Sequence, residues 1–109
     1  MKKEVVKIML DFCVGPIWKS RFNEDYDLVT GIEAIDNDEV LMKISDEINS
    51  LNNMNYRLKN NLPVYDLKAA RKNKNKMLVL LNRLNLRLNE INDGTFIIND
   101  FETNRIMNL

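Results

Sequence analysis

The sequence predicts an α+β domain in which a small two- or three-stranded sheet packs on an antiparallel two-helix hairpin. Near the start, Val6, Ile8, Leu10 and Phe12 alternate with other residues in the period of a strand. After residue 40 the apolar residues recur every three or four positions, as in amphipathic helices. With 109 residues, 45% of them hydrophobic and 29% charged, the chain is expected to form a single domain, 1–109, around one core.

The strands are expected at both ends of the chain. The first covers residues 5 to 12 and is stopped by Gly15-Pro16, because proline fixes φ and lacks an N–H. A second extended piece, suited to an edge strand, follows at residues 17 to 22. Residues 23 to 37 are expected to form a polar loop that turns at Gly31, and residues 95 to 98 a short third strand.

The first helix is expected to begin between Asp36 and Asp38, where an Asx cap precedes further carboxylates in the first turn. Pro63 is expected to end it, with residues 60 to 65 as the connection to the second helix, so that no strand falls within residues 40 to 58. The chain's seventeen asparagines are expected mainly on solvent-facing positions. The apolar stripe of this helix consists of Leu41, Ile44, Ile48, Leu51 and Leu58.

The second helix is expected from about Asp66 to Asn92, with Asp93-Gly94 as its C-terminal stop. Asp100 then caps a last turn or two of helix. Helices joined by a short connection most often pack antiparallel. The apolar stripe of the second helix consists of Met77, Leu81, Leu84, Leu88 and Ile91.

Charge is balanced in number, with 16 basic and 16 acidic residues, but not in position. Antiparallel packing would place the acidic and basic blocks at opposite ends of one body, which gives the molecule an electric dipole. Two interpretations stay open: solvated surfaces that provide solubility, or recognition of a charged partner. The acidic block, residues 24 to 47, holds nine carboxylates against Lys43; the basic block, residues 57 to 87, holds nine bases against Asp66.

The sequence offers little for catalysis. It has no histidine, which excludes Ser-His-Asp and Cys-His pairs and zinc sites of the usual kind. The run Asp36-Asn37-Asp38-Glu39 lacks the spacing of a calcium loop and is better explained as a helix start. The single cysteine, Cys13, is expected to be a small, half-buried hydrophobe. We therefore expect a non-enzymatic protein without catalytic, cofactor-binding or metal-binding residues.

The cytoplasm is the expected location. One cysteine suits a reducing compartment, and the basic start resembles no signal peptide because Lys7 and Asp11 interrupt its apolar stretch. The longest apolar run, Met77 to Leu81, is far too short to span a membrane.

Nucleic acid is the main alternative partner, through the basic 57–87 block and the neighbouring Tyr56 and Tyr65. The pI of about 6.3 and the acidic block speak against a polyanionic partner. A nucleic-acid-binding or phage-type regulatory protein that acts through the basic block is nevertheless kept as the alternative function.

Motifs at both ends of the chain resemble a family of small cytoplasmic bacterial proteins, some of which resemble immunity proteins of polymorphic or contact-dependent toxin systems. These motifs are residues 7–18 (KIMLDFCVGPIW), Thr30-Gly31-Ile32, residues 35–38 (IDND), Leu84 and residues 87–96 (RLNEINDGTF). Residues from about 52 to 75 do not fit the family's pattern, so if specificity lies in that stretch, the partner of this chain differs. The resemblance implies no catalytic residues.

An immunity protein implies a cognate toxin as partner, often a nuclease with a basic cleft, which an acidic surface can cover. We expect Trp18 and Tyr26, which flank the acidic loop, to be anchors, although Trp18 also suits a core position. The oligomeric state stays open. The partner-binding residues expected from the sequence are Trp18, Tyr26, Glu33, Asp36, Asp38 and Glu39.

Overall fold

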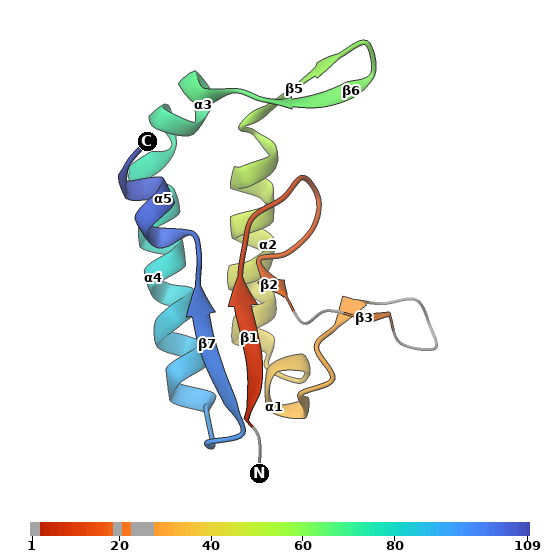
Figure 1. Cartoon of the computed structure of the whole chain (residues 1–109), viewed down its shortest axis with the longest axis vertical. Coiled ribbons are helices and arrows are strands. Elements are labelled where there is room, and N and C mark those ends of the chain that lie inside the picture. The colour runs from red at the N-terminus through yellow and green to blue at the C-terminus, as the bar shows by residue number, and fades with distance from the viewer. Residues whose placement is uncertain (1–2, 19–20, 23–27) are drawn as a thin grey trace.

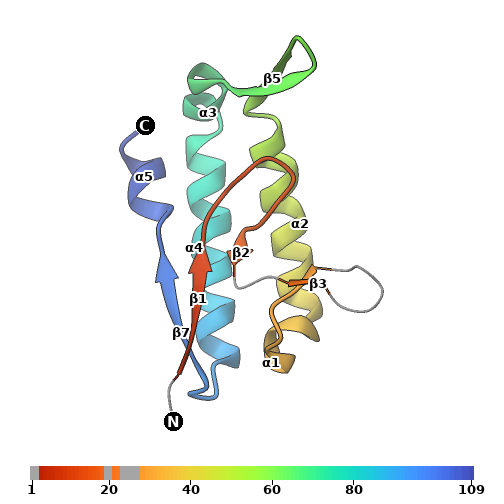
Figure 2. The same cartoon turned by 45° about the vertical axis from the view of Figure 1, so that its right-hand side comes forward.

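A computed structural model describes residues 3–18, 21–22 and 28–109 of the chain. A three-stranded sheet has β1 (Glu4–Ile8) at its centre, antiparallel to β2 (Ile17–Trp18) and parallel to β7 (Phe96–Asp100). The long helices α2 (Glu39–Asn53) and α4 (Lys74–Ile91) lie side by side and cover one face of this sheet (Figures 1 and 2). The predicted α+β class is therefore confirmed.

The core forms where the sheet meets the helix pair. Val6 and Ile8 alternate along β1, so both point to the same face of the sheet, and neither is exposed. The expected stripe of α4 is buried at Met77, Leu81, Leu84 and Leu88, with Ile91 partly buried. On the other elements the buried hydrophobic residues packed into this core are Ile35, Leu41, Ile48, Leu51, Phe96 and Ile106.

The first long helix ends earlier than the sequence predicts. It stops at Asn53, and residues up to Pro63 form instead a hairpin of β5 (Tyr56–Lys59) and β6 (Leu62–Tyr65), so a strand does enter the 40–58 window. Leu58, expected in the helical stripe, lies on β5 and is 72% exposed. The hairpin projects beyond the end of α2 (Figure 1).

Asparagines explain this ending. Asn is a poor residue for helix interiors, and Asn60 and Asn61 adopt the positive φ values, 52° and 64°, that a tight two-residue hairpin turn requires. Asn55 is 2% exposed and accepts a hydrogen bond from Asn73 Nδ2 at 2.9 Å through its Oδ1. Its carbonyl also accepts from the backbone N–H of Asp66 at 2.7 Å, which ties the hairpin to the next helix.

The second long helix is interrupted once. Asp66 caps α3 (Leu67–Lys72) by accepting from the backbone N–H groups of Lys68 and Ala69, as expected for the start of the helix. At Asn73 the backbone leaves the helical region and α4 begins. Because the Asn73 side chain bonds to Asn55, the break lies where the hairpin is attached.

The remaining differences concern short elements. The first strand ends at Ile8, and an isolated bridge between Asp11 and Val14 turns the chain. The expected piece at 17 to 22 divides into β2 and β3 (Arg21–Phe22), and β3 pairs with β4 (Leu28–Val29) in a separate two-stranded sheet. Part of the expected loop is a short helix, α1 (Glu33–Asp36).

The C-terminal helix α5 (Thr103–Met107) begins three residues after Asp100, whose carboxylate accepts from the backbone N–H groups of Glu102 and Thr103 and so supplies the predicted capping contact. Asn85 Nδ2 donates to the same carboxylate at 2.9 Å and so joins α4 to the end of β7. No helix within the described ranges has the length and apolar character needed to cross a membrane.

Candidate protein-binding surface

Antiparallel packing of α2 and α4 separates most of the charge along the long axis of a body that extends 44 × 31 × 24 Å. We call the exposed carboxylates around α1, the start of α2 and the end of α4 the acidic end: Glu33, Glu39, Glu90 and Asp93. We call the exposed bases of the β5–β6 hairpin and α3 the basic end: Arg57, Lys59, Lys68, Arg71 and Lys72. The two groups lie at opposite ends of the molecule (Figure 1).

Asp38 is a structural residue within the acidic end. Its Oδ2 accepts from the backbone N–H of Leu41 at 2.9 Å and caps α2. Arg87 of α4 donates to both carboxylate oxygens, from Nη2 at 2.6 Å and from Nε at 2.9 Å. These hydrogen bonds from Arg87 hold the pKa of Asp38 below its usual value. Asp38 and Arg87, from opposite charge blocks, thus neutralise each other.

Asp36 is also committed to the fold. Its Oδ1 accepts from both the backbone N–H and the hydroxyl of Thr30, each at 2.8 Å, and its Oδ2 accepts from the backbone N–H of Gly31 at 2.9 Å. Thr30 is itself 5% exposed. The carboxylate therefore fixes the entry into α1.

Glu33 and Glu39 are the two expected carboxylates that remain exposed. Glu33 lines a surface depression of about 610 Å³ together with Glu4, Asp93 and Thr95. Hydrogen bonds from the hydroxyl and the backbone N–H of Thr95 lower the pKa of Asp93, which keeps that carboxylate charged. Three carboxylates from distant parts of the chain thus line one concave surface.

Trp18 lies on β2, partly buried. Its Nε1 donates to the carbonyl of Met9 at 2.9 Å across the chain reversal. Gly15, at φ +92°, lies beneath the indole, where an added Cβ would be 2.5 Å from the Met9 oxygen and 2.9 Å from Trp18 Nε1. The Gly-Pro-Ile-Trp motif is therefore explained by packing. Tyr26 lies outside the described residues.

Three asparagines of α2 hold the loop between β1 and β2. This role was not predicted from the sequence, because the asparagines were expected mainly at solvent-facing positions. Asn49 Nδ2 donates to the Gly15 carbonyl at 2.8 Å and Asn52 Nδ2 to the Asp11 carbonyl at 3.1 Å. Asn53 Oδ1 accepts from the backbone N–H of Cys13 at 3.0 Å. Their spacing on one side of the helix is the signal that could have identified them.

A pocket of about 300 Å³ opens between this loop and α2. Ile17, Asp36, Met42 and Asn49 are among the residues that line it. The Asn49 Oδ1 atom is buried and accepts no hydrogen bond within the described part of the chain. Asp36 is the last residue of α1, so this concave, partly apolar surface lies next to the acidic end.

The basic end has an aromatic cluster at its base. The ring centroids of Phe12 and Tyr56 lie 5.1 Å apart, and those of Tyr56 and Tyr65 lie 5.3 Å apart in an edge-on contact. The Arg105 guanidinium lies 5.9 Å from the Tyr65 centroid. Burial is the main cause of the raised pKa of Tyr56. Both tyrosines are thus occupied within the fold and do not form a free stacking platform.

The chemistry of the remaining candidate residues is limited. Cys13, expected to be half-buried, is exposed at a positive φ of 61° in the turn after β1. Within residues 3–18, 21–22 and 28–109, no group of three or more cysteine and carboxylate side chains is placed to hold a metal ion.

Comparison of the chain with protein-family models, curated proteins and solved structures finds no significant match.

Proposed function

We propose that the protein is a non-enzymatic, protein-binding immunity protein that neutralises a cognate bacterial toxin in the cytoplasm. In this proposal the acidic end covers a basic site on the toxin. The observation that carries it is the exposed Glu33, which lines one depression with Glu4 and Asp93, together with the exposed Glu39 at the start of α2. Acidic surfaces accelerate association with basic partners through electrostatic attraction and suppress binding to acidic ones.

The structure narrows the set of residues that can perform this role. Asp36 and Asp38 accept hydrogen bonds from the protein itself, so their substitution would damage the fold and the surface together. Glu33 and Glu39 are exposed and can be changed with little effect on the core. Trp18 contributes by holding the adjoining loop, through its hydrogen bond to Met9.

The test compares two matched double charge reversals, Glu33→Lys with Glu39→Lys at the acidic end and Lys68→Glu with Lys72→Glu at the basic end. The binding partner is a catalytically inactive form of the protein encoded by the neighbouring gene. We expect the acidic-end variant to lower the association rate constant by about tenfold or more and the basic-end variant to change it little. Wild-type association should also slow as salt is raised.

Circular dichroism and thermal unfolding of both variants establish that they are folded. A partner that binds the acidic-end variant as fast as the wild type, or that loses affinity only with the basic-end variant, would contradict the proposal. The second result would favour the alternative function, a nucleic-acid-binding or regulatory protein, for which the exposure of the bases on α3 and the hairpin is the supporting observation.

A further inference from the structure

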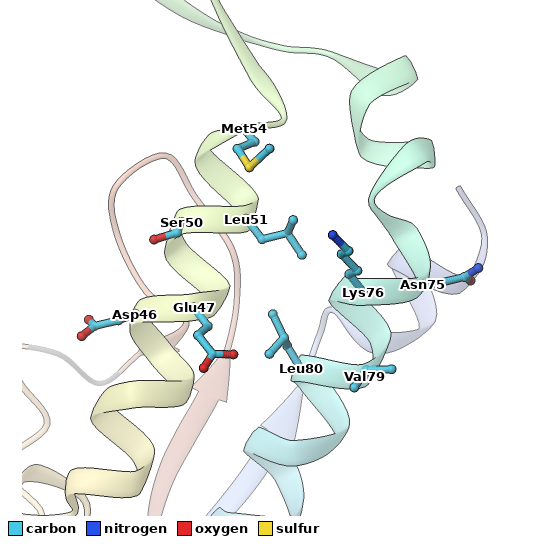
Figure 3. Close-up of a pocket in the computed structure, with 9 residues that line it drawn as sticks. All are labelled: Asp46, Glu47, Ser50, Leu51, Met54, Asn75, Lys76, Val79 and Leu80. Carbon is cyan, nitrogen blue, oxygen red and sulfur yellow. The ribbon is translucent and has the colours of Figure 1, made fainter.

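The face of the helix pair that points away from the sheet carries an apolar groove of about 700 Å³ between α2 and α4. Leu51 of α2 and Leu80 of α4 point into it, as Figure 3 shows. Met54 and Val79, at its rim, are 66% and 53% exposed. Further along the same helices, Val40 and Leu86 are 46% and 56% exposed. Apolar surface of this extent on a small protein is a common mark of an interface.

The two walls of the groove carry opposite charge. Glu47 reaches toward it from α2 and Lys76 from α4 (Figure 3), and Arg83 is exposed one to two turns after Lys76. None of the ion pairs formed between described residues uses Glu47, Lys76 or Arg83. The groove therefore has an acidic wall and a basic wall whose charges are available to a partner.

We propose that a second copy of this chain docks on the groove, with a two-fold axis parallel to α2 and α4, to form a four-helix layer. Rotation about such an axis leaves each residue at the same height along the helices in both copies. It places the acidic wall of one copy opposite the basic wall of the other. Since Glu47 and Leu51 line the same groove as Lys76 and Leu80, it brings Glu47 of each copy over Lys76 of the other. The contact is isologous, so each such pair occurs twice.

The same two faces could also meet about a two-fold axis perpendicular to the helices, but the charges that line the groove would then repel each other. An axis that crosses the helices at mid-length would place α2 on α2 and bring like carboxylates, Asp46 and Glu47, near each other. The parallel axis does place the two acidic ends on the same side of the dimer, and salt screens the repulsion between exposed charges there that lie more than about 8 Å apart. The charge pattern of the groove walls therefore selects the parallel axis.

The experiment measures molar mass in solution for the full-length wild type and two single charge reversals, Glu47→Lys and Lys76→Glu. Light scattering after size exclusion, over roughly 1 μM to 1 mM protein, covers moderate to weak affinities. We expect the wild type to approach twice the chain mass of 12.8 kDa with rising concentration. Each variant alone should dimerise at least about tenfold more weakly, since it places like charges opposite each other twice.

The decisive sample is an equimolar mixture of the two variants. Under the proposed symmetry, Lys at position 47 of one copy meets Glu at position 76 of the other, while the remaining Glu47 meets the remaining Lys76. The mixture should therefore dimerise with an affinity close to that of the wild type, although each variant alone dimerises more weakly. The matched control is Lys72→Glu, the same charge change on the exposed face of α3, which should leave the mass unchanged.

A neutral polar variant, Val79→Asn, tests the apolar part of the contact without adding a charge. It should weaken the dimer, and no charge-reversed partner should restore it. A wild type that stays monomeric up to about 1 mM, a mixture that fails to recover the dimer, or a dimer unaffected by all of these changes would each overturn the proposal. None of these results bears on toxin binding, because Glu33 and Glu39 do not line the groove.

Discussion

Asp38 and Asp36 show how a charged residue in an acidic block can belong to the architecture of the protein. Asp36 accepts from the backbone N–H groups of Thr30 and Gly31, just before α1. Asp38 caps α2 and in addition holds Arg87 through two hydrogen bonds. The sequence predicts a helix start at these two residues, and both were also expected to contact a partner. Only the position of α4 beside α2 shows that Arg87 neutralises Asp38, and that position depends on tertiary packing.

Asp38→Asn tests this pairing, because asparagine is an equally good helix cap but carries no charge. We expect the variant to lose about 1 to 3 kcal/mol of unfolding free energy at neutral pH, as for hydrogen bonds to charged groups. The folded-state pKa of Asp38 is lowered, so its contribution is present above the unfolded pKa and is lost as pH falls through the folded pKa.

Urea unfolding at several pH values provides the measurement. The difference between wild type and Asp38→Asn should therefore shrink as the solution is acidified below about pH 4. Glu39→Gln is the control, an exposed carboxylate one residue along that forms no ion pair with a described residue. A difference that is constant with pH would show that the substitution acts on packing and not on charge.

Trp18 illustrates a motif whose cause is visible only in three dimensions. The sequence suits both a core and an anchor role for this residue, and the structure shows its Nε1 donating to the Met9 carbonyl, with Gly15 next to the indole. A glycine is required there because any Cβ would collide with a backbone oxygen. The Gly-Pro-Ile-Trp part of residues 7–18 is thus explained by packing within the protein, and it identifies no partner.

At the scale of elements, the helix seams could be predicted because burial imposes a period on the sequence. The first four residues of the α4 stripe, from Met77 to Leu88, are each at most 1% exposed. The end of α2 could not be predicted in the same way. Leu58 fits the helical period by chance, and Asn60 and Asn61 fit a helix end as well as a hairpin turn. The buried Asn55, which joins the hairpin to α3 and α4, decides between them.

A pair of leucine truncations measures this distinction. Leu84→Ala should cost on the order of 2 to 5 kcal/mol of unfolding free energy, because it removes a fully buried side chain from the seam. Leu58→Ala is the matched control at a position that is 72% exposed and should cost no more than about 0.5 kcal/mol. Chemical denaturation of both variants gives the two values, and equal losses would mean that the hairpin is packed against the body.

At the scale of the whole molecule, antiparallel helices turn a charge pattern along the sequence into two ends of a body. That separation follows from the sequence alone once the helix pair is recognised. The sequence alone does not show which charges remain free to contact a partner, because some of them pair within the fold. Arg87 pairs with Asp38, and Arg57 pairs with Asp66 at 3.3 Å. In the proposed dimer both acidic ends would face the same direction, so one dimer could present two acidic surfaces.

The two functional hypotheses differ most clearly in their response to nucleic acid. We expect the wild type to show no binding to labelled single-stranded RNA or duplex DNA beyond the weak non-specific range, with Kd about 10⁻⁴ M or weaker at physiological salt. The acidic end opposes a polyanion, and Tyr56 and Tyr65 already pack against each other and against Phe12 and Arg105.

Fluorescence anisotropy between about 50 and 200 mM salt provides the measurement, since phosphate contacts make affinity fall steeply over this range. Lys68→Glu with Lys72→Glu serves as the comparison variant. If the wild type binds tightly, and the variant both weakens binding and reduces the salt slope, the basic end contacts phosphates directly. The function would then be that of a nucleic-acid-binding regulator, and the acidic end would keep nucleic acid away from the rest of the surface.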